Sequence, residues 1–216
     1  MYKIILFDLD GTLTESKEGI INSIIYALQK LGIEECDLSR LQPFIGPPLL
    51  DSFIQAYGFS KPKAELAVQY YRENFSVKGI YENKLYNGIL QLLDDLVHAG
   101  KIIVLATSKP LVYATEVLNY FGISEFFSYL TGSGLDGSHT DKTEIIKGVI
   151  DHYYAYSLEE FIMIGDRKYD IEGAKNNGIA SVGVLYGYGA REELEKVMPE
   201  FLVHHPAEIK NIIFPK

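Results

Sequence analysis

The chain has 216 residues, of which 47% are hydrophobic and 23% charged, with a formal net charge of −9 and a single cysteine. This composition suits a core with at most a modest second domain and argues against extensive disorder. The negative charge disfavours a nucleic acid polymer as partner, because phosphate binding needs a basic face. One cysteine cannot form an intramolecular disulfide, and no apolar run approaches the ~20 residues of a membrane helix. We therefore expect a cytoplasmic protein that does not associate with membranes. The oligomeric state is open at this point, with a monomer favoured.

Four short apolar runs along the chain predict buried parallel strands. They cover residues 3–8, 101–107, 161–165 and 180–185. Helical patterns occupy residues 89–98, 111–120, 143–152 and 169–177, and several are followed by a glycine that favours a helix end. Alternating strands and helices predict an α/β fold with a Rossmann-like parallel sheet and helices on both of its faces.

The segment after the first strand breaks this alternation. From Ser16 to about residue 83 the sequence has helical periodicity and no strand-like run. Ser16 is a candidate N-cap for a helix that runs to Leu31, and prolines at 47, 48 and 62 could begin two more helices. We therefore predict a catalytic core of residues 1–14 and 84–216, with an all-helical domain of residues 15–83 inserted into it.

Polar residues follow three of the predicted strands. Ligands of open parallel sheets bind beyond the carboxyl ends of the strands. The residues expected at that edge are Asp8 and Asp10 after the first strand, Thr107, Ser108 and Lys109 after the second, and Asp166 and Asp170 after the third. The helical insert follows the first strand directly, so it should begin at the same edge of the sheet.

The segment Asp8-Leu9-Asp10-Gly11-Thr12 carries the sharpest signal. In extended backbone the two carboxylates point the same way, so one could attack while the other handles protons. An aspartate is a competent nucleophile toward phosphorus, because the acyl phosphate that it forms is easily hydrolysed. A solvated turn is the simpler alternative, but unpaired carboxylates directly after a buried strand are expensive. A calcium-binding EF-hand loop is excluded, since Leu13 and Gly19 stand where it needs Gly and Glu.

Asp166 and Asp170 are four residues apart and would share a helical face. With Asp8 they could supply hard oxygen ligands to one Mg²⁺. An equally good interpretation is that they are acids at a helix N-terminus that suit the helix dipole. Thr107 and Lys142 gain meaning beside these acids, because a hydroxyl can donate to a phosphoryl oxygen and a lysine can offset charge.

Four motifs in this order resemble those of haloacid dehalogenase superfamily phosphatases with a small helical cap. Asp8–Thr12 matches Asp-x-Asp-Gly-Thr, Thr107 the strand-terminal Thr or Ser, Lys142 the lysine, and residues 165–170 Gly-Asp-x-x-x-Asp. The resemblance covers essentially the whole chain. It is strongest to the phosphoglycolate phosphatase-like group and its bacterial 5′-nucleotidases. Residues 165–170 and 184–189 look closer to the nucleotidase-like members, whereas Ser108 and Asp141-Lys142-Thr143 depart from the phosphoglycolate phosphatase pattern.

The resemblance implies the chemical roles. Asp8 would be the nucleophile that becomes phosphorylated and Asp10 the general acid and base, while Thr107 and Lys142 would bind phosphoryl oxygens. Mg²⁺ would be held by Asp8, Asp166, Asp170 and the backbone carbonyl of Asp10. The substrate would be a small phosphorylated metabolite, contacted by Gly11, Thr12, Ser108 and Lys109. From the position of the insert after the first strand we also expect contacts from Phe44, Gly46 and Arg72, the alternative for Arg72 being a solvated helix residue. The loop from Tyr186 to Gly189 is a second candidate for specificity.

Three other functions remain open at this point. A β-phosphoglucomutase-like phosphomutase would use the same site and return the phosphate to a sugar. A dehalogenase of this fold does not need the second acid, so Asp10 argues against it. A non-catalytic phosphoryl-binding regulator should have lost a site residue, and none is lost. The sequence does not identify the substrate.

Overall fold

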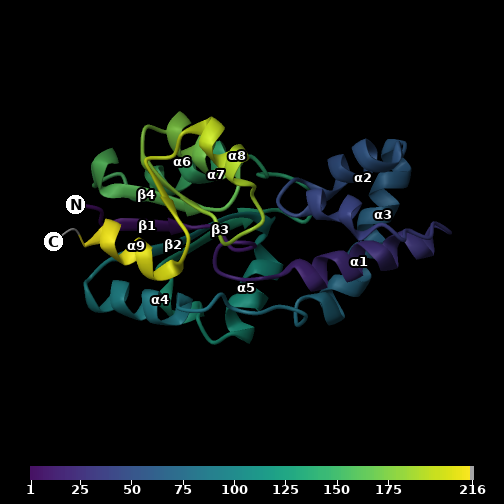
Figure 1. Ribbon diagram of the computed structural model, residues 1–216, viewed down its shortest axis with the longest axis horizontal. Coiled ribbons are helices and arrows are strands. Elements are labelled where there is room, and N and C mark those ends of the chain that lie inside the picture. Colours follow the sequence, from purple (N-terminus) through teal and green to yellow (C-terminus); the bar gives the residue numbers. More distant parts are fainter. Residues whose placement is uncertain (215–216) are drawn as a thin grey trace. The chain divides into compact units, whose positions relative to one another are not determined.

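A single six-stranded parallel sheet forms the centre of the core in a computed structural model that describes residues 1–214 (Figure 1). The strand order is β3-β2-β1-β4-β5-β6, and every neighbouring pair is parallel. The strands are β1 (Ile4–Phe7), β2 (Ile102–Pro110), β3 (Tyr129–Ser133), β4 (Phe161–Gly165), β5 (Ala180–Val184) and β6 (Phe201–Val203). The predicted α/β fold is thereby confirmed.

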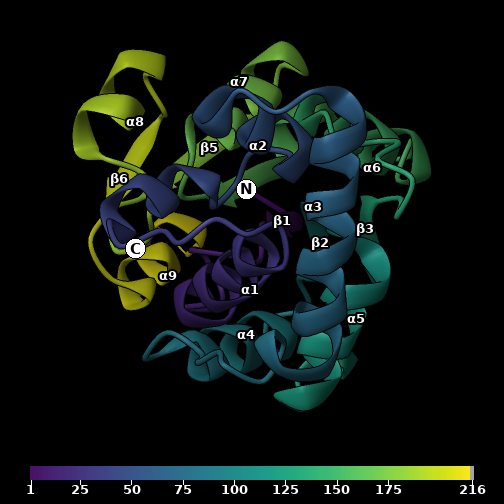
Figure 2. The same cartoon turned by 90° about the vertical axis from the view of Figure 1, so that its right-hand side faces the viewer.

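Helices cover both faces of this sheet, as Figures 1 and 2 show. One layer contains α6 (Lys142–His152), α7 (Lys168–Asn176) and α8 (Arg191–Val197), and the opposite layer contains α4 (Ile89–His98), α5 (Leu111–Tyr120) and α9 (Pro206–Ile213). Short helical turns η3 (Ser124–Phe126) and η4 (Leu158–Glu160) precede β3 and β4. Because the sheet is covered twice, all four residues of β1 are buried, which explains why its sequence is a continuous apolar run and not an alternating one.

Glycines end three helices of the core, α4, α5 and α7, as predicted. After α7, Gly178 adopts a left-handed φ of 70°, its N–H donates to the carbonyl of Lys175, and the N–H of Ile179 donates to that of Ala174. This pattern of two backbone hydrogen bonds satisfies the last carbonyls of a helix and turns the chain toward the next strand. Gly100 and Gly122 end α4 and α5 in the same way.

Several elements of the core were not anticipated. The strands β3 and β6 lie at the two edges of the sheet, and α8 and α9 flank β6 in the chain. β3 is only half-buried over most of its length, and Phe201 of the three-residue β6 is 37% exposed. Such edge strands lack the continuous apolar run of a central strand. In addition, β2 continues past its predicted end at Thr107 to Pro110, with a register shift against β3.

Residues 16–84 form a second compact unit built from helices. They are α1 (Lys17–Lys30), η1 (Leu38–Phe44), α2 (Leu49–Tyr57), α3 (Lys61–Asn74) and the π-helical turn η2 (Phe75–Gly79). Ser16 stands at the N-cap position of α1, but its side chain makes no capping hydrogen bond. Pro48 precedes α2 as its N-cap, whereas Pro62 lies in the first turn of α3.

The chain leaves and re-enters the first unit, residues 1–15 with 85 onward, at neighbouring points. Thr14 and Leu85 form an antiparallel bridge, and the N–H of Tyr86 donates to the carbonyl of Leu13 over 3.1 Å. The helical insert therefore begins and ends beside the segment that carries Asp8. None of the helices between residues 1 and 214 has the length and apolarity to cross a bilayer.

Candidate active site

The site is built where the direction of strand addition reverses. β2 and β3 add on one side of β1, and β4 to β6 add on the other. The carboxyl end of β1 lies at this switch point, where open α/β sheets bind their ligands. Asp8 follows β1 there, and its N–H donates to the carbonyl of Ile164 in β4 over 3.0 Å.

A tight turn follows Asp8. The carbonyl of Leu9 accepts the N–H groups of Thr12, Leu13 and Thr14, and Gly11 at its centre has a φ of +86°. A Cβ at Gly11 would lie less than 3.0 Å from the carboxylate of Asp166. Glycine is needed here twice, for its left-handed backbone and for the close approach of Asp166.

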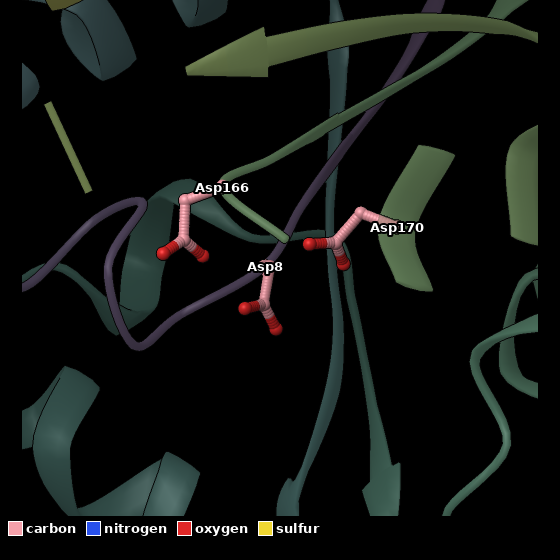
Figure 3. Close-up of side chains that lie close together, drawn as sticks. All are labelled: Asp8, Asp166 and Asp170. Carbon is pink, nitrogen blue, oxygen red and sulfur yellow. The ribbon is translucent and has the colours of Figure 1, made fainter. Parts of the chain in front are cut away.

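Three carboxylates converge beside this turn (Figure 3). One oxygen each of Asp8, Asp166 and Asp170 can be chosen so that all three lie within 4.8 Å of one another, and no other such acidic, histidine or cysteine group occurs in residues 1–214. Asp170 lies in the first turn of α7, where its carboxylate accepts the N–H of Arg167. Asp166 precedes that helix, so the expected shared helical face is wrong: the loop after β4, and not a helix turn, brings the two acids together.

Lys142 is the buried cation of this cluster. Its ammonium lies 2.8 Å from Oδ1 of Asp8 and 2.7 Å from Oδ1 of Asp170, and it donates to the carbonyl of Ala106 over 2.9 Å. Two of these contacts, to Asp8 and Ala106, are hydrogen bonds, and the contact with Asp170 is an ion pair. Burial lowers the pKa of Lys142, but the carboxylates of Asp170 and Asp8 outweigh this effect, so the net pKa lies above its ordinary value.

The charge of the cluster is not balanced by the protein. Three carboxylates face one ammonium, so two negative charges are left when all are ionised. Burial, reinforced by the neighbouring carboxylates of Asp170 and Asp8, raises the pKa of Asp166 well above its ordinary value. Burial also raises the pKa of Asp170 to about 6, although Lys142 opposes the shift. Oδ1 of Asp166 is buried without a hydrogen-bond partner among the described residues. A hard divalent cation fits this set of oxygens.

Asp10 pairs with a second lysine. Nζ of Lys109 lies 2.9 Å from Oδ2 and 3.1 Å from Oδ1 of Asp10, and both side chains are largely buried. Thr107 is buried in β2, and its Oγ1 accepts the N–H of Lys109 over 3.2 Å. Ser108 instead donates its hydroxyl to the carbonyl of Thr140 over 2.9 Å. The extension of β2 beyond Thr107 thus brings Lys109 to the second acid of the turn.

The residues expected to contact the substrate are differently placed. Thr12 is fully buried, and its hydroxyl has no partner within residues 1–214. In the helical unit, Phe44 is 2% exposed and packs edge-on against Phe53 at 5.1 Å, which gives its ring a packing role. Gly46 is exposed with a φ of 109°, and Arg72 is half-buried in the last turn of α3.

The sequence-based search missed the contacts of Asp166 with residues 186–189. The backbone N–H of Tyr188 donates to Oδ2 of Asp166 over 2.7 Å. Because the donor is a main-chain group, residue identity at position 188 carries no signal for it. The two flanking glycines, Gly187 and Gly189, were the available clue, since a Cβ at either would lie less than 3.0 Å from an atom of Asp166.

Comparisons with known proteins agree with this arrangement. The family model for haloacid dehalogenase-like hydrolases matches residues 5–184. A 5′-nucleotidase of Pseudomonas aeruginosa is 46% identical over 212 residues, which cover 98% of this chain and 96% of that protein. The crystal structure of a predicted phosphatase from Clostridium acetobutylicum is 42% identical and has a TM-score of 0.93, covering 99% of this chain and 98% of the other.

Two further relatives have names other than 5′-nucleotidase. The tyrosine-protein kinase PtkA of Mycobacterium tuberculosis is 35% identical over 204 residues, covering 94% of this chain and 68% of the kinase. A phosphoglycolate phosphatase of Vibrio parahaemolyticus is 26% identical over 219 residues, covering 98% and 96%. The family match spans most of the chain, and the two relatives that match over nearly their whole length are named 5′-nucleotidase and phosphoglycolate phosphatase. The chain therefore belongs to the haloacid dehalogenase-like hydrolase family and is an enzyme of the phosphatase type.

Proposed function

We propose that the protein is a Mg²⁺-dependent phosphatase that hydrolyses a small phosphate monoester through a phosphorylated Asp8. One observation carries the proposal: the carboxylate of Asp8 lies at the switch point of the sheet, 2.8 Å from Lys142 and within one oxygen cluster with Asp166 and Asp170. A carboxylate held in this way is aligned by its neighbours and is largely shielded from water, as a nucleophile needs to be.

In the first step, an oxygen of Asp8 attacks phosphorus in line, and the bond from phosphorus to the leaving oxygen breaks. Asp10, two residues along the same turn, gives its proton to that leaving oxygen. Lys142 and the hydroxyl of Thr107 bind the phosphoryl oxygens, where negative charge gathers in the transition state. The buried hydroxyl of Thr12 is a further donor without a partner among the described residues.

In the second step, Asp10 takes a proton from a water molecule, and that water attacks the phosphorus of the aspartyl phosphate. The products are inorganic phosphate and free Asp8, and Asp10 is again protonated for the next cycle. The ammonium of Lys109 lies 2.9 Å from Oδ2 of Asp10, beside the group that moves this proton.

Asp8, Asp166 and Asp170 would hold Mg²⁺, together with the main-chain carbonyl of Asp10. When bound, the ion supplies electrostatic stabilisation of the phosphoryl group and offsets the two uncompensated charges of the cluster. The unpartnered Oδ1 of Asp166 supports this assignment, because a buried carboxylate oxygen without a donor is costly unless a cation takes that place.

The helical unit would select the substrate without taking part in the chemistry. Its support is topological: the insert leaves and re-enters the core at Thr14 and Leu85, beside the turn that carries Asp8 and Asp10. Arg72 remains our candidate for contact with an anionic or polar leaving group. Phe44 would act only indirectly, since its ring is buried within the unit.

A nucleoside 5′-monophosphate is the substrate class that the relatives favour. The relative named 5′-nucleotidase is 46% identical, whereas the relative named phosphoglycolate phosphatase is 26% identical. Phosphoglycolate is the second candidate. A cytoplasmic location stays a prediction from composition, and a monomer stays the favoured oligomeric state.

A hydrolysis screen with Mg²⁺ tests the proposal. The panel contains nucleoside 5′-monophosphates, phosphoglycolate, sugar phosphates and pyrophosphate, with release of inorganic phosphate as the readout. Asp8→Asn serves as the matched control for contaminating phosphatase. Product analysis by ³¹P NMR separates hydrolysis from transfer of the phosphoryl group to a sugar or a protein tyrosine. Turnover that is equal in the wild type and in Asp8→Asn would refute the proposed nucleophile.

A further inference from the structure

A loop far along the chain closes over Asp166. It consists of Tyr186–Gly189, directly after β5, and we call it the clasp. Its central N–H, that of Tyr188, donates to Oδ2 of Asp166 over 2.7 Å. Its first side chain reaches the turn after β1, where the hydroxyl of Tyr186 donates to the carbonyl of Thr12 over 3.0 Å. The clasp thus contacts two segments of the candidate site at once.

The clasp approaches Asp166 more closely than any side chain would permit. A Cβ at Gly187 would lie within 3.0 Å of both the Asp166 side chain and the carbonyl of Gly11, and a Cβ at Gly189 would collide with the carbonyl of Asp166. These are contacts with main-chain atoms and with a buried acid, which cannot move aside cheaply. The Gly-x-Gly spacing is therefore a steric requirement of this contact.

The two oxygens of Asp166 have different surroundings. Oδ2 is held by the N–H of Tyr188, while Oδ1 is buried without a hydrogen-bond partner among the residues that the structure describes. A carboxylate that is fixed through one oxygen presents the other in a defined direction. Partners of this kind orient metal ligands and are worth about 10–100-fold in metal affinity or activity.

We propose that the clasp is a positioning element for the divalent cation: it holds Oδ2 of Asp166 so that Oδ1 is aimed at the metal. This inference rests on the proposed metal site. It gives the Gly187 and Gly189 backbone a role in metal binding, and it does not require the clasp to touch the substrate. Tyr186 would act through Thr12, by fixing the clasp to the turn that carries Asp8.

Metal binding to the substrate-free enzyme tests the proposal. The dissociation constant for Mn²⁺ is measured by EPR of the free ion, and that for Mg²⁺ by calorimetry, with far-UV circular dichroism and thermal unfolding as checks of the fold. Gly187→Ala and Gly189→Ala should weaken the binding of both ions by about 10–100-fold. Tyr186→Phe, which adds no bulk, should weaken the binding of each ion about 2–10-fold, in line with the loss of one hydrogen bond. Gly148→Ala in α6, where a Cβ would meet no atom within 4 Å, should change neither constant.

The turnover of the alanine variants gives an independent readout. Saturating Mg²⁺ should restore much of their kcat, because the defect lies in binding the ion. Folded Gly187→Ala and Gly189→Ala proteins with wild-type affinities would overturn the role of the clasp. If neither folds, an unchanged affinity of Tyr186→Phe overturns it. Failure of the metal site itself is distinguishable: the wild type and Asp166→Asn would then show the same weak binding.

Discussion

Lys142→Met tests whether the acidic cluster depends on its buried lysine. The substitution conserves the approximate length of the side chain but removes an ammonium that is bonded to Asp8, Asp170 and the carbonyl of Ala106. Removing one partner of a buried ion pair costs about 3–5 kcal/mol, because the other charge is left uncompensated. At about 2–4 °C per kcal/mol for a chain of this size, the melting temperature should fall by roughly 6–20 °C.

The pH dependence of this loss has a definite sign. The pKa of Lys142 is raised in the folded protein, so its stabilisation is complete below the unfolded value of 10.5 and is lost only above it. At pH 7.5 the variant therefore loses the whole contribution of Lys142 to the stability of the folded protein. Asp170 has a pKa of about 6 even with Lys142 present, and without the lysine it would be protonated more readily still. The difference in melting temperature between the variant and the wild type should be smaller at pH 5.5, where protonation removes negative charge from the cluster.

The assay is thermal unfolding followed by circular dichroism, in EDTA at pH 7.5 and 5.5, and again with Mg²⁺. Lys147→Met is the matched control, because Lys147 lies in the same helix with its side chain 59% exposed and pairs with Asp151 on the surface. It should change the stability by no more than about 0.5 kcal/mol. If Lys142→Met is as stable as Lys147→Met in EDTA at pH 7.5, the reasoning about the cluster is wrong.

Four more outcomes are expected. Asp8→Asn should abolish turnover and the hydroxylamine-sensitive aspartyl phosphate seen by mass spectrometry, and the variant should still fold, because the two side chains are nearly isosteric and the cluster loses one of its excess carboxylates; a phosphoprotein that persists would point to another nucleophile. Asp10→Asn should lose about 10²–10⁴-fold on alkyl phosphates and less on p-nitrophenyl phosphate, which needs little protonation; equal losses would count against Asp10 as the acid. Mg²⁺ affinity should fall as the pH drops from 8 through about 6, with proton release on binding, because the raised pKa values of Asp166 and Asp170 make protons compete with the ion; calorimetry in two buffers measures this, and a pH-independent affinity would contradict it. Arg72→Ala should reduce kcat/KM on the preferred substrate and spare p-nitrophenyl phosphate; no change on either would remove Arg72 from substrate selection.

The central part of the fold was readable from the sequence because burial on both sides leaves an unambiguous pattern. β1, with its four buried apolar residues, is the clearest case. The edge strands were not readable for the converse reason. β6 has three residues, of which Phe201 is partly exposed, so neither an apolar run nor a strict alternation marks it.

The same contrast holds for the site. Asp8 and Asp166 could be proposed because they are acidic residues that directly follow predicted buried strands. Lys142 could be proposed because a lysine beside such acids can offset their charge. The ion pair of Lys109 with Asp10 depends on how far β2 continues past Thr107, which local propensity does not determine. The hydrogen bond from Tyr188 is made by the main chain, so only the adjacent glycines hinted at a close approach.

The bridge between Thr14 and Leu85 has an evolutionary consequence. It joins the two ends of the insert within the first unit, so the core itself holds the entry and the exit of the insert together. Closing a longer loop costs only about 0.6 kcal/mol for each doubling of its length. Descendants of such a chain could exchange, enlarge or trim residues 16–84 almost without penalty to the sheet. The bridge thus marks the point at which a different insert could change the substrate selectivity while the catalytic core is retained.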